Sequence, residues 1–183
     1  MFNYGTFKLF VLKIFCGFIL VGLSSFLLIS VLSYNMADPG FGKLNETSEI
    51  KNFFGFWGSL TASFYLIFLG KVSIILIVFL FYIGVLFIIG ITLNKPFIKF
   101  CLLAIAVVFL DFSILIQQVD ILKTGVIPTL LFETLKFNLP IIFDSFLYKL
   151  IMSILFLLIS FFLFLFSFSI KINLIKSLLL KVA

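Results

Sequence analysis

Few side chains in this sequence can do chemistry, and the most conspicuous is Asp111, a carboxylate inside an otherwise apolar stretch. The chain has no histidine, so the usual general base, proton shuttle and zinc ligand is missing. Gly42-Lys43-Leu44 and Gly70-Lys71-Val72 lack the hydroxyl and the upstream glycine of a phosphate-binding loop. We therefore expect no catalytic residue, no cofactor and no metal site in this chain.

Asp111 requires polar side chains at its own depth in the membrane as partners. It lies roughly 22 Å beyond Pro96 along a helix that rises about 1.5 Å per residue, inside a hydrocarbon core about 30 Å thick. The serines expected at the same depth are Ser24, Ser25 and Ser153. A coupling or ion site, a structural polar contact, and an acid that reaches interfacial water all stay open.

The elements that position these residues must be helices in lipid. The chain is 64% hydrophobic and 11% charged, against about 45–50% and about 25% in soluble domains. Four apolar stretches reach the roughly 20 residues that cross a bilayer. We predict an all-α polytopic membrane protein, one integral membrane domain with spans at about 9–32, 71–93, 97–116 and 149–170. The run 155–169, built of Phe, Leu, Ile and Ser, is predicted to face lipid and to carry no chemistry.

The lysines predict the direction of these spans. They gather in the amino-terminal flank, in the turn after the second span and in the tail, as Lys8, Lys13, Lys95, Lys99, Lys171, Lys176 and Lys181. The loops 33–51 and 117–149 instead balance lysines with acids. By the positive-inside rule both termini are cytoplasmic and both long loops face outward. The net charge of +6 thus indicates topology, and we expect no direct contact with nucleic acid.

Two short interfacial helices are predicted on the outer side, at about 52–69 and 128–137. On the first, small residues share one side and bulky ones the other; the small set is Asn52, Gly55, Ser59, Ala62, Ser63 and Leu66. The repeat of Gly55, Ser59 and Ser63 allows close helix packing or self-association, or it is a chance pattern in an interfacial helix. On the second, Pro128 fits a first turn. Its Leu130, Leu131 and Leu135 are predicted to face lipid, and Glu133 and Lys136 water.

The turn after the first span carries the most specific pattern. It reads Ser33-Tyr34-Asn35-Met36-Ala37-Asp38-Pro39, and Asp38 is expected to accept hydrogen bonds from nearby backbone amides. Further along come Asn52, Gly55, Gly58, Ala62 and Gly70, and then Gly125-Val126-Ile127 ahead of the last span. The pattern resembles the amino-terminal four-helix membrane domain of FtsK/SpoIIIE-type DNA translocases. Met36, Ser59, Ser63 and Pro128 depart from it, where the family has Pro, Ala, Asp and Gly.

The resemblance implies an inner-membrane anchor at the division septum, linked in the family to a hexameric ATP-driven motor that pumps chromosomal DNA. The chain ends at Ala183, shortly after the last span, so the motor is expected to be absent from it. Expected partners are the lipid bilayer, further copies through small-residue helix faces, and division-septum proteins. Two other functions stay open: a small transporter or channel subunit that uses Asp111, and a stand-alone membrane scaffold.

Overall fold

The computed structural model describes residues 4–42, 49–91, 94–116, 125–140 and 145–168. Its helices are α1 (Tyr4–Leu32), α2 (Gly55–Leu69), the 3₁₀ turn η1 (Lys71–Ser73), α3 (Ile74–Ile89), α4 (Pro96–Ile116), α5 (Val126–Asn138) and α7 (Phe146–Ser167). Within these described ranges, four segments are long and apolar enough to span a membrane: Lys8–Leu32, Lys71–Ile89, Pro96–Ile116 and Phe146–Ser167. The predicted all-α, four-span fold with short additional helices is confirmed.

Local chemistry sets the helix ends and moves some predicted boundaries. Gly90 ends α3 in the left-handed conformation (φ 84°), with its amide and that of Ile91 bonded back into the last turn. Pro96 opens α4, where its missing N–H costs nothing. Ser145 caps α7 by accepting from the amide of Tyr148 at 3.3 Å, so this helix starts a few residues before the predicted span.

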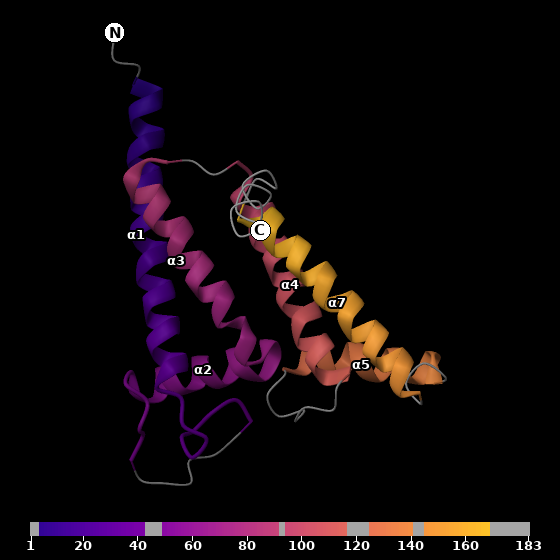
Figure 1. Ribbon diagram of the computed structural model, residues 1–183. Helices are drawn as coiled ribbons and strands as arrows, with labels where there is room; N and C mark the ends of the chain where they lie inside the picture. Colours follow the sequence, from indigo (N-terminus) through magenta and orange to yellow (C-terminus); the bar gives the residue numbers. More distant parts are fainter. Residues whose placement is uncertain (1–3, 43–48, 92–93, 117–124, 141–144, 169–183) are drawn as a thin grey trace, which may run out of the picture.

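The spans are arranged as two pairs, α1 with α3 and α4 with α7 (Figure 1). In the first pair, Gly17 faces Gly84. A β-carbon on Gly17 would lie 2.8 Å from the carbonyl oxygen of Gly84, and one on Gly84 would lie 2.8 Å from a methyl of Val21. Two glycines therefore let the backbones of α1 and α3 approach closely, as small residues do between membrane helices.

The second pair is joined by three serines of α7. The hydroxyls of Ser153, Ser160 and Ser167 donate to the carbonyls of Ser113, Ala106 and Lys99 at 3.0, 2.7 and 2.8 Å. Both series advance by seven residues in opposite directions, as expected for antiparallel helices that keep one seam in contact over two turns per repeat. The run 155–169 is predicted to face lipid, but Ser160 and Ser167 within it are buried and bond to α4.

We expect Ser160→Ala to weaken the α4–α7 pair. A hydrogen bond between membrane helices contributes about 0.6 kcal/mol on average and up to about 1.7 kcal/mol, so the free energy of unfolding in micelles should fall by about 1 kcal/mol. Ser24→Ala is the matched control, since its buried hydroxyl donates to Leu20 and Val21 of its own helix. An equal loss in both variants would show that the cross-helix bond has no special role.

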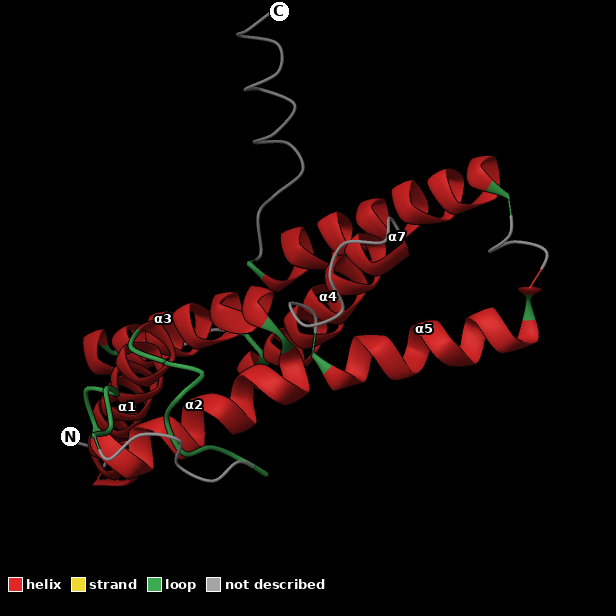
Figure 2. Ribbon diagram, turned by 90° about the horizontal axis from the view of Figure 1, so that it is seen from below, coloured by secondary structure: helices red, strands yellow, loops and turns green. Residues whose placement is uncertain are grey.

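The helices α2 and α5 lie across one end of the two pairs, here called the loop end (Figures 1 and 2). Seen from below in Figure 2, they follow one another in a line, and α2 contacts α5. Above them, Leu76, Phe79 and Ile83 of α3 pack with Leu103 and Val107 of α4 to form the core between the pairs. The remaining surface of α1 and α7 is largely exposed apolar side chains, which suits a lipid solvent.

Candidate functional site

The motif residues meet at the loop end, where residues 33–42 and 49–54 pack on α2; we call this the turn junction. Its centre is Asp38, which is 2% exposed. One carboxylate oxygen accepts from the amide of Lys51 at 2.9 Å, and the other from the amide of Asn52 at 2.8 Å. The prediction that Asp38 binds backbone amides is confirmed, and its effect is to close the long loop on itself.

Asn52 connects this closed loop to α1 and α2. Its side-chain amide donates to the carbonyl of Ser30 at 2.8 Å, and its oxygen accepts from the amide of Phe54 at 3.1 Å. A β-carbon on Gly58 would collide with that same oxygen. The motif needs glycine at position 58 because the amide of Asn52 occupies the space of a side chain.

Hydroxyl groups complete the turn junction. Ser59 donates to the carbonyl of Pro39 through a short hydrogen bond, and Ser63 accepts from the amide of Phe41 at 2.7 Å. Ser33 accepts from the amide of Phe53 at 3.1 Å. Tyr34 packs beside Ala62 in a small apolar cluster. Ser59 and Ser63, the two departures from the family pattern on α2, are therefore integral to the turn junction.

The small-residue side of α2 is buried as the pattern indicates, but against the chain's own turn rather than a second copy. Two assignments to this packing face are wrong. Asn52 precedes the helix, which begins at Gly55. Gly55 meets nothing within 4 Å and instead supplies a positive φ of 59°, which lets the chain enter the helix. The bulky side is exposed, with Trp57 at 69% and Phe64 at 49%.

The remaining motif glycines join the two helix pairs. Gly70 ends α2 with a φ of 75° and turns the chain into η1. Gly125, which precedes α5, packs directly on this bend: a β-carbon there would lie 2.5 Å from the nitrogen of Gly70 and 2.6 Å from the carbonyl oxygen of Phe68. The neighbouring Ile127 is exposed and Pro128 is buried in the first turn of α5, as its fixed φ allows.

Gly125→Ala should separate α5 from the α2 bend. All three nearest atoms to the added carbon belong to backbone, which cannot move aside cheaply. We expect overpacking to cost about 1–3 kcal/mol in unfolding free energy. Gly22→Ala is the control, because nothing lies within 4 Å of that position. A stable Gly125→Ala protein with unchanged melting would show that this contact is not tight.

The second short helix differs from its prediction at one position. Leu130 and Leu131 of α5 are exposed, in keeping with a lipid-facing side, and Glu133 and Lys136 are exposed as well. Leu135, however, packs against Phe112 and Ile116 of α4 rather than lipid. Its prediction as lipid-facing is wrong because α5 lies under α4 and turns this side of the helix into the bundle.

Asp111 lies inside the bundle, with 0% of its side chain exposed, and both of its carboxylate oxygens lack a hydrogen-bond partner among the described residues. The expected cluster with Ser24, Ser25 and Ser153 is wrong. The two α1 serines belong to the other helix pair, and Ser153 donates to the carbonyl of Ser113. The sequence gives residue depth but not which helices pair, so residues at equal depth need not meet.

The chemistry available around these residues is that of a structural joint. Among the described residues, no three His, Cys, Asp or Glu side chains gather to hold a metal ion. Cys16 and Cys101 are both free thiols. Burial raises the pKa of Tyr65 to about 12 against the opposing effect of its hydrogen bond with Ser73. At neutral pH this phenol is therefore a proton donor, and it donates to the carbonyl of Ser73 at 2.7 Å.

The fold and the turn junction together define a class: a membrane domain of four spanning helices whose connecting segments are fastened at one end by a turn motif and two short helices. Residues 11–172 match the family described as the 4TM region of DNA translocase FtsK/SpoIIIE. The chain belongs to this family, since the match covers most of its length. No curated protein and no solved structure matches it.

Proposed function

We propose that this chain is the inner-membrane anchor of an FtsK-like DNA translocase that acts in cell division and chromosome segregation. The observation that carries the proposal is the family match over residues 11–172. The contacts within the turn junction support it. Asp38, Asn52 and Gly58 depend on one another through hydrogen bonds and excluded volume. Motif residues that fit together in this way are hard to attribute to composition alone.

The direction of the domain is also part of the proposal. Both termini lie in the cytoplasm, and the loop end with α2 and α5 faces outward, because the lysine-rich flanks stay inside. Cysteine labelling tests this in a background that lacks Cys16 and Cys101. An impermeant maleimide should label Met36→Cys in intact cells and Asn94→Cys only after the membrane is opened; both native residues are exposed. Labelling in the reverse order would overturn the orientation.

Location in the cell tests the function. A fluorescent fusion of the chain, expressed in its source bacterium, should gather as a band at the division site. Asp38→Ala is the comparison variant, which should still insert into the membrane but lose the turn junction. An even distribution of the unaltered chain around the membrane would contradict the septal role. Reading the gene beyond codon 183 would separate a translocase, which continues into a phosphate-binding loop, from a stand-alone scaffold.

Self-association and contact with septal proteins belong to the same proposal. The small-residue side of α2 does not supply the surface, because Ser59 and Ser63 bond to the chain's own turn. The exposed faces of α1 and α7 are the surfaces that further copies would use. Crosslinking between single cysteines on these faces in native membranes tests this, and absence of crosslinked dimers from either face would argue against it.

One observation favours a second candidate function, passage of protons or cations. Asp111 is a fully buried carboxylate without a hydrogen-bond partner among the described residues, at a depth where such a group is costly. A transporter or channel subunit would show proton or cation flux in liposomes that disappears in Asp111→Asn. Absence of proton and cation flux with the unaltered chain would reject the transporter function and favour the membrane-anchor function.

A further inference from the structure

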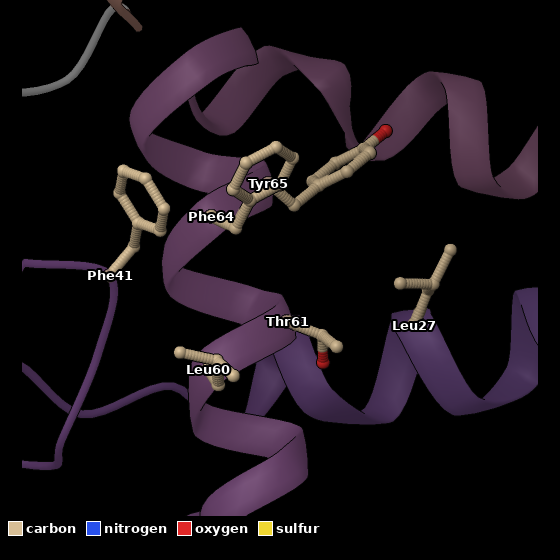
Figure 3. A pocket seen from close by; sticks show the side chains of 6 residues that line it. All are labelled: Leu27, Phe41, Leu60, Thr61, Phe64 and Tyr65. Carbon is tan, nitrogen blue, oxygen red and sulfur yellow. The ribbon is translucent and has the colours of Figure 1, made fainter.

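A groove opens between α1, α2 and the turn that follows α1 (Figure 3). Its volume is about 320 Å³. One side comes from the spanning helix α1 and the others from α2 and the turn: it is lined by Leu27, Phe41, Leu60, Thr61, Phe64 and Tyr65. The lining is thus almost entirely hydrocarbon and aromatic rings.

The two polar side chains of the lining are already engaged. The hydroxyl of Thr61 donates within α2 to the carbonyls of Trp57 and Gly58, at 2.8 and 3.1 Å. The phenol of Tyr65 donates to Ser73. The groove therefore presents no spare hydrogen-bond donor, and a polar ligand would lose its bonds to water without replacement. Only a ligand without hydrogen-bonding groups suits it.

The groove continues the lipid-facing surface of α1. Phe15, Ile19, Leu23 and Leu27 follow at four-residue spacing, which places them on one side of the helix. The first three are half or more exposed, and the fourth lines the groove. Leu27 lies about 7 Å before the end of α1 at about 1.5 Å per residue. The groove thus lies near one edge of the hydrocarbon layer, and a chain lying along α1 leads directly into it.

Size selects the occupant among apolar candidates. A volume of about 320 Å³ is at the lower end of the roughly 300–1,000 Å³ of small-molecule pockets. A helix from a second copy or a partner is about 10–12 Å wide with its side chains, which is broad for this space. Trp57, one turn before Thr61, is exposed and is of the residue type that gathers at membrane interfaces, beside lipid headgroups.

We propose that this groove binds one acyl chain of a membrane phospholipid, which wedges between α1 and α2 and supports the angle between them. The proposal is independent of the DNA translocase role. It concerns how the lipid bilayer completes the loop end of the domain, and it holds or fails for the isolated chain in a membrane.

Lipid retention tests the proposal. The chain is reconstituted in vesicles of dioleoyl phosphatidylcholine, extracted in mild detergent and weighed by native mass spectrometry. Thr61→Trp fills the groove. Thr134→Trp is a matched control, since Thr134 is an exposed threonine of α5 whose hydroxyl likewise donates to carbonyls of its own helix. The unaltered chain and Thr134→Trp should keep one phosphatidylcholine per chain, and Thr61→Trp should show at least a tenfold smaller one-lipid peak.

Three results would overturn the acyl-chain proposal. They are a series of lipid adducts with no preferred number in the unaltered chain, equal lipid retention by Thr61→Trp and the unaltered chain, or a protein dimer that dissociates in Thr61→Trp. Circular dichroism and gel filtration check that Thr61→Trp is folded. If it is not, Leu60→Trp fills the groove from the neighbouring position. Trp57 is the only tryptophan of the chain, so quenching of its fluorescence by dibrominated phosphatidylcholine gives a second readout in the unaltered protein, with saturation at low bromolipid fraction expected.

Discussion

Asp38→Ala should lower the free energy of unfolding by about 3 kcal/mol and, under the proposed function, abolish septal recruitment of the chain. The carboxylate accepts two backbone amides at 2.9 and 2.8 Å inside the turn junction. Hydrogen bonds to a charged acceptor contribute about 1.5–3 kcal/mol each, and their removal leaves the amide of Asn52 buried and unpaired. The two losses are not additive because both bonds close the same loop.

Two further variants sharpen this prediction. Asp38→Asn keeps the shape and one acceptor oxygen, so it should lose about half as much stability as Asp38→Ala. Glu133→Ala removes an exposed acid from α5 at the same end of the protein and should change stability by less than about 0.5 kcal/mol. Unfolding is followed in micelles by loss of helical dichroism. If Asp38→Ala melts with the unaltered protein, the carboxylate does not hold the junction.

The turn junction shows what the sequence can predict and where it stops. Asp38 before Pro39 predicts a turn with amide acceptance from local chemistry, and the structure has it. A helical projection places Asn52 on the small-residue face of α2, yet Asn52 precedes α2 and bonds to Ser30 of α1. A helical projection treats every residue as helical and cannot show that a side chain reaches across to a different element.

Helix pairing explains the other differences. Depth along a span follows from residue counting, which predicts one common depth for Asp111, Ser24 and Ser153. Which helices adjoin depends on the close approach at Gly17 and Gly84 and on the serine seam of α7. The seven-residue spacing of Ser153, Ser160 and Ser167 was present in the sequence. Its meaning depends on carbonyls of α4 at matching intervals, which no side-chain pattern reveals.

Asp111→Leu is expected to raise the free energy of unfolding by about 1–3 kcal/mol. A buried polar group without a partner destabilises the fold by its desolvation cost. Leucine has the same number and branching of side-chain heavy atoms as aspartate and removes that cost. Both oxygens of Asp111 lack a partner among the described residues, and its neighbours on the same side of α4, Val107 and Leu115, are buried and apolar. Asp111→Asn keeps an unpaired polar group at the same place, so it should gain nothing.

The same pair of variants separates structure from function at this position. A more stable Asp111→Leu protein that still reaches the septum would mean that the acid is dispensable there. A more stable protein that fails at the septum, or loses flux in liposomes, would mean that the buried acid is retained for activity at the expense of stability. Loss of stability in Asp111→Leu would contradict the prediction, because such a loss would mean that the carboxylate has a polar partner. In that case Asp111→Asn should restore what Asp111→Leu loses, since an amide can still form a hydrogen bond where a hydrocarbon cannot.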